Sequence, residues 1–344
     1  MTRPKTTVSS SIVAAVAALV TVAAVIVLTA DAPGRTMSVF LLGPFQNRYN
    51  LGNFLSQASL LTMTGAGVVI AFRSGVFNLG GEGQVYLGAL VVTIVLTASP
   101  LPPIAAVLIA GTAAASVAAL SGWILHRTGA DELITSFLLS ATLVPVIDYL
   151  IVGPFRDVET NLLATRKIPP GTELLRILPP STLSSGIFWA AAAVLFLWFL
   201  LHWTLVGYEL RIVGYNRRLA RYAGIPVGWY TTLPMALSGL FHGLAGAVLV
   251  MGIHHRSILG FSGGLGWNGI AVALIARNRP LLIVPAALFF AFLNAGARAA
   301  VLQNQTTWEL GSLIQGVVFL FVTADVLSGV RRRRRSTPQH GGSQ

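Results

Sequence analysis

The stretch FRSGVFNLGGEGQ, residues 72–84, interrupts a long apolar run with four glycines and several polar side chains. Backbone inside a membrane must satisfy its own hydrogen bonds, so such a break is tolerated only within the protein or beside a water-filled cavity. We therefore expect Asn78, Glu82 and Gln84 to face the interior. An ionisable group at membrane depth is costly and marks a functional site by default, which directs attention to Glu82. The structural alternative is that Asn78 and Glu82 cap the ends of broken helices while the glycines allow close helix packing.

The rest of the chain is strongly apolar. Of its 344 residues, 54% are hydrophobic and 10% are charged, and the mean hydropathy is +0.75. A membrane-crossing helix needs about 20 such residues. The sequence predicts an all-α polytopic membrane protein with about ten transmembrane helices, at residues 12–30, 53–72, 83–99, 102–125, 132–152, 185–205, 229–253, 264–277, 280–299 and 309–329. The absence of cysteine excludes disulfides and thiolate metal sites.

The basic residues predict the topology. Ten crossings put both termini on one side, and a cytoplasmic placement assigns 15 of the 23 Lys and Arg residues to the inside: Arg3, Lys5, Arg73, Arg127, Arg211, Arg217, Arg218, Arg221, Arg277, Arg279 and Arg331 to Arg335. Residues 1–11 then form a cytoplasmic N-terminus and residues 331–344 a cytoplasmic basic tail. The arginine run that follows the last apolar segment is typical of a membrane anchor near anionic headgroups, so the net charge of +12 does not indicate nucleic-acid binding.

Two polar segments lie between apolar runs. Residues 153–186 hold five of the 17 prolines and mixed charges, which predicts an external loop or short surface helices. Residues 207–228, GYELRIVGYNRRLARYAGIPVG, are basic and compact. Their arginines fall at near-helical spacing, and the turn from Gly224 to Pro226 would end such a helix.

A partial repeat links two distant parts of the chain. RSGVFNLGGEG from Arg73 and RSILGFSGGLG from Arg256 align without a gap and share five of eleven residues. The offset spans five of the predicted crossings, so the two copies would run through the membrane in opposite directions. Such inverted repeats, with glycine-interrupted segments at corresponding positions, are typical of transporters and point to the substrate path.

Three blocks carry a resemblance to a known family: FRSGVFNLGGEGQVYLGAL, GYELRIVGYNRRLARYAGIPVG and GFSGGLGWNGIAVALIARNRP. In this order, over about residues 50 to 330, the chain resembles the permease subunits of bacterial ABC importers for nucleosides and simple sugars, within the branched-chain amino acid permease superfamily. The FN-L-G-EGQ block resembles the nucleoside branch, and the VG-N---A-YAGI block is shared more widely. The segment from Asp131 and residues 1–50 match the family less well.

The resemblance implies a core of two permease subunits, identical or homologous, in a bacterial plasma membrane. It also implies a separate ATP-binding subunit that holds the ATP and Mg, and an extracytoplasmic substrate-binding protein. Residues 207–228 match the family's cytoplasmic coupling region, which docks on the ATPase. The expected coupling residues are Arg211, Gly214, Asn216, Arg217, Arg218, Arg221, Tyr222, Gly224 and Ile225.

This chain is predicted to be a transport subunit rather than an enzyme. It contains no G-x-x-x-x-G-K-[ST] motif, so it has no phosphate cradle of that kind, and we expect it to bind no cofactor. GLGWNG, residues 264–269, matches the dinucleotide fingerprint, but no strand precedes it. Trp267 and Asn268 could instead line the path by stacking and by amide hydrogen bonds, or simply pack.

Two other classes stay open as alternatives. GFSGG, residues 260–264, matches G-x-S-x-G, as in an intramembrane serine protease, but the only histidine after Ser262 is His340 in the tail. A proton-coupled secondary transporter would need carboxylates near the midplane, and Asp148 is the one well inside a predicted span; Glu309 and Asp325 lie near span ends. The cluster of His254, His255 and Arg256 lacks the carboxylates of a metal site. We interpret it as an outer loop that touches the binding protein.

The sequence therefore predicts one transmembrane permease domain over residues 1–344, belonging to an ATP-driven importer of a nucleoside or a related purine-like or sugar-containing solute. The expected path residues are Asn78, Glu82, Gln84, Trp267 and Asn268. Glycines would let the backbone approach the solute or a neighbouring helix, at positions 75, 80, 81, 83, 263, 264 and 266.

Overall fold

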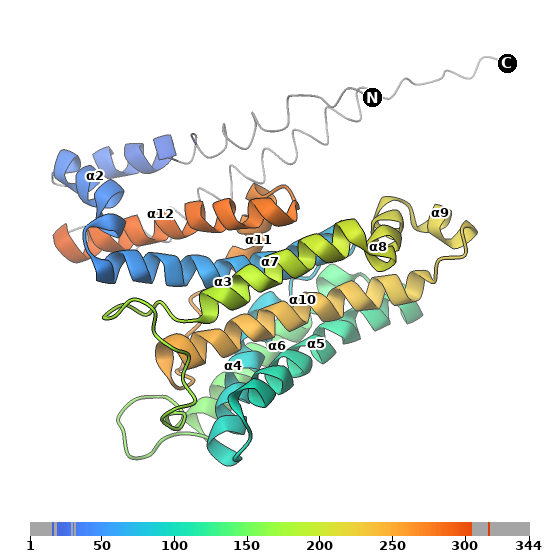
Figure 1. Ribbon diagram of the computed structural model, residues 1–344, viewed down its shortest axis with the longest axis horizontal. Helices are drawn as coiled ribbons and strands as arrows, with labels where there is room; N and C mark the ends of the chain where they lie inside the picture. Colours follow the sequence, from blue (N-terminus) through green and yellow to red (C-terminus); the bar gives the residue numbers. More distant parts are fainter. Residues whose placement is uncertain (1–15, 17–18, 29, 31, 305–315, 317–344) are drawn as a thin grey trace. The chain divides into compact units, whose positions relative to one another are not determined.

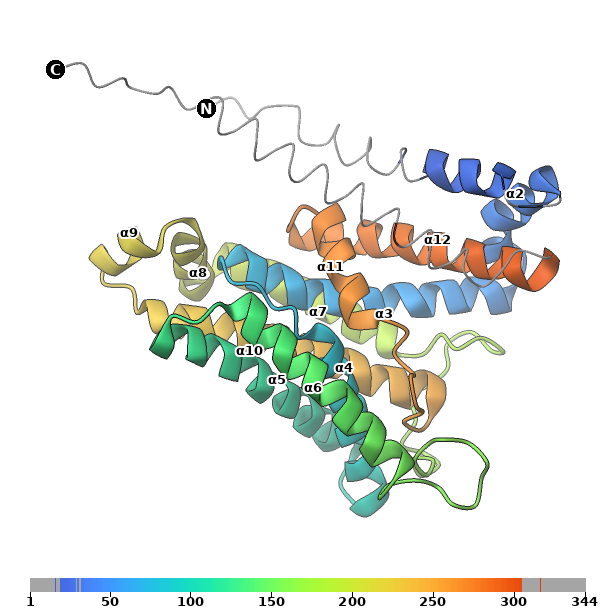
Figure 2. The same ribbon diagram turned by 180° about the vertical axis from the view of Figure 1, so that it is seen from behind.

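The computed structural model describes residues 16, 19–28, 30, 32–304 and 316, and the regular elements of this part of the chain are helices. Figures 1 and 2 show them from opposite sides. They are α2 (Pro33–Leu42), η1 (Gly43–Phe45), α3 (Arg48–Arg73), α4 (Gly81–Ala98), α5 (Pro103–Thr128), α6 (Glu132–Val152), α7 (Gly186–Trp203), α8 (Leu205–Tyr215), α9 (Arg217–Tyr222), α10 (Val227–Leu249), η2 (Val250–His254), α11 (Leu265–Ile275), η3 (Pro280–Leu282) and α12 (Ile283–Asn304).

Seven helices in this part of the chain are long and apolar enough to cross a membrane, which confirms a multi-pass membrane protein. They are Arg48–Arg73, Gly81–Ala98, Pro103–Thr128, Glu132–Val152, Gly186–Trp203, Val227–His254 and Pro280–Leu302. Of the remaining predicted spans, 12–30 is described only in part, as the short apolar helix Leu19–Leu28. The span 309–329 lies outside the described residues apart from residue 316. The total of ten therefore stays a prediction.

The predicted crossing at residues 264–277 is shorter than expected. Its helix, α11, runs only from Leu265 to Ile275 and is about 16 Å long at 1.5 Å per residue, roughly half the thickness of the hydrocarbon layer. The chain before it is unwound, because Gly260, Gly263 and Gly264 adopt positive φ angles that do not fit a helix. The correction is that this crossing is a broken one, made of a segment of turns and a half-helix.

The chain divides into two compact units: residues 47–291, and residues 1–46 together with 292–344. In the second unit, the Phe40 ring lies edge-on to Phe292, with ring centroids 6.0 Å apart. A side chain at Gly296 would meet Phe40, with its Cβ 3.1 Å from the ring atom Cδ2. A glycine is therefore required where α2 and α12 approach each other.

Within residues 47–291, small residues bring the helices into close contact. A Cβ at Gly239 of α10 would lie 2.5 Å from the Ala114 carbonyl oxygen of α5, and a Cβ at Gly88 of α4 would overlap the backbone of Gly243. Membrane helices gain stability from such close packing, because lipid provides no hydrophobic driving force between them. α10 therefore forms the centre of this unit, with α4 and α5 packed against it (Figure 1).

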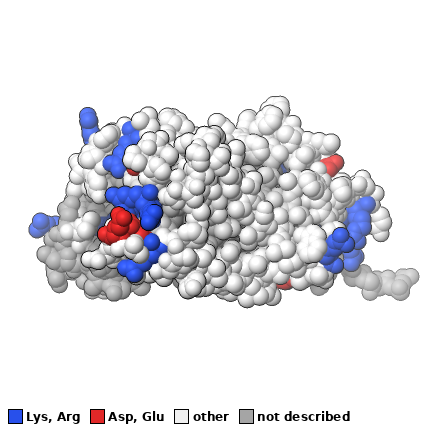
Figure 3. Space-filling model, turned by 90° about the horizontal axis from the view of Figure 1, so that it is seen from below, with Lys and Arg blue, Asp and Glu red and all other residues white. Residues whose placement is uncertain are grey.

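The links between helices of this unit gather at two ends, as the predicted alternation of crossings requires. At one end His126 of α5 packs on Gly228, and Arg217 lies near Glu132. At the other end the segment 153–186 pairs with residues 251–259 and with the start of α3, where Thr182 donates its N–H to the Asn53 side chain at 2.9 Å. Figure 3 shows a face on which charged side chains gather towards two ends and leave an uncharged band between them.

Candidate substrate path and coupling segment

The first glycine break, residues 74–80, leads into a helix that begins midway through the unit. Gly81, the first residue of α4, packs on His242, which lies near the middle of the long α10–η2 helix; a Cβ there would be 2.6 Å from the histidine Nε2. From this point α4 runs towards the end that carries segment 153–186, where the Thr93 and Ser257 hydroxyls are 2.9 Å apart. α4 is therefore a helix that starts inside the protein.

The helix that follows the second break, α11, begins at the same place and runs the other way. A Cβ at Gly266 would overlap the backbone of Gly81 and Glu82. Further along, Gly269 packs on Thr64 of α3, and α11 follows α3 towards its Arg73 end. The two breaks thus meet, and the helices that follow them run in opposite directions. This is the geometry that the inverted repeat predicts.

Glu82 connects the two breaks. Its side chain is buried, with 9% of the residue exposed. One carboxylate oxygen accepts the Gly266 N–H at 2.8 Å, and the other accepts the Ser262 hydroxyl. Glu82 thereby caps the start of α11 from the first turn of α4. Its hydrogen bonds hold α4 and the second break together, and it is also the ionisable group at the point where α4 and α11 meet.

Asn78 and Gln84 bond mainly to each other. The Asn78 amide donates to Gln84 Oε1 at 2.8 Å and to the Ser238 hydroxyl at 2.9 Å. In return Asn78 Oδ1 accepts from the Gln84 amide at 3.0 Å and from the Gly80 N–H at 2.8 Å. Both side chains are buried. This closed network fits the structural alternative for these two residues, and their role as path residues stays a prediction.

Trp267 and Asn268 lie on α11 directly after the break. The Trp267 ring is half-buried and its centroid is 6.1 Å from that of Phe137 on α6. Asn268 is buried beside Gly264. Both residues therefore lie on the first turn of α11, directly after Gly266, which contacts Glu82 of α4.

Sequence reasoning missed two serines and a histidine that hold the first break. Ser136 and Ser140 of α6 accept the N–H groups of Leu79 and Gly83, at 3.0 and 2.8 Å. The fully buried His242 fills the space left by Gly67 and Gly81. The available signal was the spacing of the two serines, one helical turn apart in DELITSFLLS, which places both on one face.

The predicted coupling segment consists of two helices rather than one. α8 ends at Tyr215, and Asn216 then adopts an extended conformation with φ −158° and ψ 104°. Its side chain accepts the N–H groups of Arg218 and Leu219 at 2.9 and 3.1 Å, and so starts α9. Helical spacing of the arginines could not reveal this break, because asparagine is tolerated inside a helix as well as at its start. α9 ends at Tyr222, and the turn at Gly224, with φ +77°, follows it as predicted.

One side of this segment contacts the first glycine break. Gly214 packs so closely on the backbone of Arg73, Ser74 and Gly75 that a Cβ would overlap the Arg73 carbonyl. Arg217 donates to the Gly75 carbonyl at 2.9 Å and lies 3.9 Å from a Glu132 carboxylate oxygen. The half-buried Arg211 donates to the Leu201 carbonyl. These residues hold the segment on the protein.

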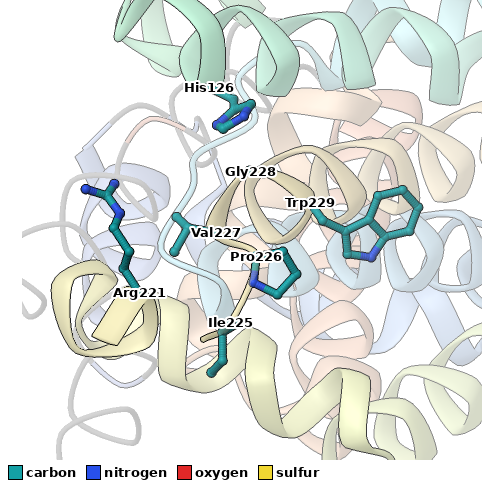
Figure 4. A pocket seen from close by; sticks show the side chains of 7 residues that line it. All are labelled: His126, Arg221, Ile225, Pro226, Val227, Gly228 and Trp229. Atoms are coloured by element: carbon teal, nitrogen blue, oxygen red, sulfur yellow. The ribbon is translucent and has the colours of Figure 1, made fainter. Parts of the chain in front are cut away.

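The other side is exposed. Arg218 and Arg221 are exposed, and Tyr222 is 91% exposed; the neighbouring Tyr215 and Leu219 also face outward. A hollow of 360 Å³ lies beside them, lined by His126, Arg221 and residues 225–229. Figure 4 shows His126 and Arg221 on one side of the link between α9 and α10, and Trp229 on the other. Basic and aromatic side chains in this arrangement are suited to a protein partner.

The second break is attached to the segment 153–186 at the opposite end. Thr165 and Ser257 exchange hydrogen bonds at 2.9 and 3.0 Å. Arg256 is only 6% exposed and lies 3.8 Å from the Asp157 carboxylate. The prediction that Arg256 touches a binding protein is wrong for this residue, because its guanidinium is buried and pairs with Asp157 of the outer segment. His255 lies 3.7 Å from Glu173.

The protease and metal alternatives find no support in this geometry. The Ser262 hydroxyl donates to Glu82 rather than to a histidine that could act as a base. Among the described residues, no three His, Cys, Asp or Glu side chains are grouped closely enough to hold a metal ion.

Comparison with known proteins gives consistent results. Residues 50–323 match the family described as the permease component of branched-chain amino acid transport systems. The chain is 33% identical to the probable riboflavin import permease protein RfuC of Treponema pallidum, over 92% of this chain and 85% of that protein. It is 30% identical to the guanosine ABC transporter permease protein NupP of Bacillus subtilis, over 82% and 83% of the two chains. It is 29% identical to the glucose ABC transporter permease protein TsgB13 of Haloferax volcanii, over 87% and 82%.

The family match covers most of the chain and includes both glycine breaks and the segment between α7 and α10. The seven long apolar helices are those of a multi-pass membrane protein. This chain therefore belongs to the permease component family of branched-chain amino acid transport systems, and is an ABC importer permease.

Proposed function

We propose that this permease imports a nucleoside or a related purine-like or sugar-containing solute, driven by ATP hydrolysis in a separate subunit. The names of its relatives support this solute range, since they include permeases for guanosine, riboflavin and glucose. One attachment supports the mechanism best: residues 207–228 are held on the first glycine break by the packing of Gly214 and by the hydrogen bond that Arg217 donates.

In this mechanism, closure of the ATPase pushes on the exposed side of α8 and α9. Because Gly214 packs on Arg73 to Gly75, the push passes to the break, and from there to Glu82 at the start of α4. Movement of α4 against α11 would open the bonds from Glu82 to Ser262 and Gly266. A small shift at the coupling segment is thereby converted into movement of one repeat against the other.

The residues divide into two proposed roles. Glu82, Trp267 and Asn268 lie at the meeting point of the half-helices and contact the solute as it passes. Asn78 and Gln84 keep the first break in shape through their mutual hydrogen bonds.

The proposed partners follow from the two ends. The ATPase docks on the end that carries Arg218, Arg221 and Tyr222, which places this end and both termini in the cytoplasm. A substrate-binding protein docks on the end that carries segment 153–186, and a second permease completes the membrane core. The chain itself needs no ATP, Mg or other cofactor.

Co-purification of the tagged protein from its native membrane tests the proposal. We expect an ATPase with a Walker A motif, together with a second permease or a binding lipoprotein. A variant with Arg218→Glu and Arg221→Glu should lose the ATPase, because electrostatic complementarity steers such contacts. The matched control reverses two exposed charges at the other end, Arg166→Glu and Lys167→Glu, and should keep it. A protein recovered alone that transports in liposomes without ATP would contradict the proposal and favour a proton-coupled carrier.

A further inference from the structure

Asp148 is a carboxylate inside a membrane-spanning helix that has no role in the mechanism above. It lies in the last third of α6, whose whole length, Glu132–Val152, is apolar enough to span the membrane. One of its oxygens, Oδ1, is fully buried and has no hydrogen-bond partner among the described residues. A buried acceptor without a partner is unfavourable, and an ionisable group at this depth marks a functional position by default.

The surroundings of Asp148 connect it with the second glycine break. The Gly260 backbone and the Tyr86 side chain lie near its carboxylate. The Tyr86 ring packs on Phe261 with centroids 4.5 Å apart, and the phenol group approaches the Ser262 hydroxyl. Ser262 in turn donates to Glu82. A row of polar groups therefore leads from Glu82, at the start of α4, towards Asp148.

Asp148 differs in its contacts from three buried acidic residues of this unit. Asp157 is held by Arg256, Glu132 lies near Arg217, and Glu82 accepts two hydrogen bonds. Asp148 takes part in no ion pair among the described residues, and its neighbour Ile147 belongs to an apolar cluster with Leu90 and Ile151. Its free oxygen is therefore not needed to hold the protein together.

We propose that Asp148, assisted by Tyr86, is a second binding position on the solute path, where its free oxygen accepts hydrogen bonds from the sugar hydroxyls of the solute. This inference rests on the proposed function and specifies which part of the solute is recognised. A neutral, donor-rich ligand such as a ribose ring supplies the missing donors without adding charge. A protein that buries an acceptor for a ligand hydroxyl discriminates strongly against analogues that lack it, because the acceptor is then left unpaired.

The test uses the complete transporter with its partner subunits, reconstituted in liposomes with ATP inside. Uptake of guanosine is compared with uptake of its 2′,3′-dideoxy analogue for the wild type and for Asp148→Asn. The substitution keeps the shape but replaces one acceptor with a donor. We expect the KM for guanosine to rise by about tenfold or more, and the preference for guanosine over the analogue to disappear. Ser116→Ala, at an exposed position of α5, should change neither value.

The outcomes separate the inference from the proposed function. A wild-type transporter that takes up neither guanosine nor any other solute of the proposed class rejects the proposed function and this inference with it. A wild type that prefers guanosine, with an Asp148→Asn variant that keeps the same preference or loses uptake of both compounds equally, overturns the inference alone. Should the asparagine variant fail to assemble, Tyr86→Phe replaces it, with a smaller loss of preference expected and an unchanged preference overturning the inference. Uptake driven by a proton gradient without ATP, and lost in Asp148→Asn, would make Asp148 a proton carrier instead.

Discussion

The two glycine breaks share a sequence pattern but are attached to opposite ends of the protein. The first, residues 74–80, is held by the coupling segment, through Gly214 and Arg217. The second, residues 255–264, is held by the outer segment, through Thr165 and Asp157. The two breaks meet at Glu82, which accepts hydrogen bonds from Ser262 and Gly266.

The difference shows that a repeated motif can keep its glycines while the contacts around its two copies diverge. The repeat preserves the glycines that let the backbones approach, whereas the contacts around each copy are unrelated. Arg73 and Arg256 occupy equivalent positions in the alignment. Yet Arg256 is buried beside Asp157, while Arg73 is half-buried at the other end, where its Nε has no partner among the described residues. The two equivalent arginines therefore have different surroundings at the two ends.

The largest effect is expected where the two breaks touch. A Gly266→Ala substitution places a Cβ onto the Glu82 amide nitrogen, which should push α11 away from α4. Overpacking of this kind costs about 1–3 kcal/mol, and here neither partner can yield because both are backbone. We expect ATP-driven uptake in reconstituted liposomes to fall to background.

The control for this prediction is Gly34→Ala in α2, where an added Cβ meets nothing within 4 Å. It should leave uptake unchanged. Normal uptake by the Gly266→Ala variant would show that contact between the breaks is not required.

A smaller loss is expected when the contact is kept but its charge is removed. Glu82→Gln replaces a charge-assisted hydrogen bond, worth about 1.5–3 kcal/mol, and turns a donor towards either Ser262 or Gly266. Uptake should fall by roughly tenfold. Ser262→Ala, which leaves the Gly266 bond in place, should fall less. An alanine variant that loses as much as the glutamine variant would assign the role to Ser262.

A third prediction compares the attachments of the two breaks. Arg256→Met leaves the buried Asp157 carboxylate unpaired and should destabilise the protein by about 3 kcal/mol, visible as a lower midpoint of thermal unfolding in detergent. Arg217 is 39% exposed at its side chain, so Arg217→Met should cost at most about 1 kcal/mol. The same Arg217 variant should reduce the coupling of ATP hydrolysis to uptake. Equal destabilisation by the two variants would contradict the difference between the two ends.

The smallest effect concerns the polar network that supports the first break. Ser238→Ala removes one acceptor from Asn78, whose amide keeps its bond to Gln84, so the loss of stability should be about 1 kcal/mol. Ser116→Ala on the exposed side of α5 is the control and should be neutral. Loss of uptake in Ser238→Ala without loss of stability would support the predicted role of Asn78 as a residue of the substrate path.

Much of the fold could be predicted because each long helix corresponds to a long run of apolar residues in the sequence. The polar break at residues 72–84 and its copy from Arg256 also predicted the inverted half-helices. The length of α11 could not be predicted, because its apolar residues continue to the arginine at 277 while three glycines with positive φ unwind the chain before it. Composition alone does not distinguish glycines that unwind a helix from those that allow close packing.

The candidate site was predicted in part for a similar reason. Glu82 was identified by its cost in a membrane, and the structure places it between the two breaks. Asn78 and Gln84 satisfy each other, a pairing across six residues that no periodic pattern reveals. Arg256 was taken for a surface residue because its partner, Asp157, lies 99 positions earlier in the chain.

The position of Glu82 between two helix starts also has an electrical consequence. The start of a helix behaves as about half a positive elementary charge, so the beginnings of α4 and α11 together amount to about one. The single negative charge of Glu82 balances them within one turn of each helix. The two helix starts and Glu82 taken together are therefore close to neutral, so an uncharged solute meets little net charge at the point where the breaks touch.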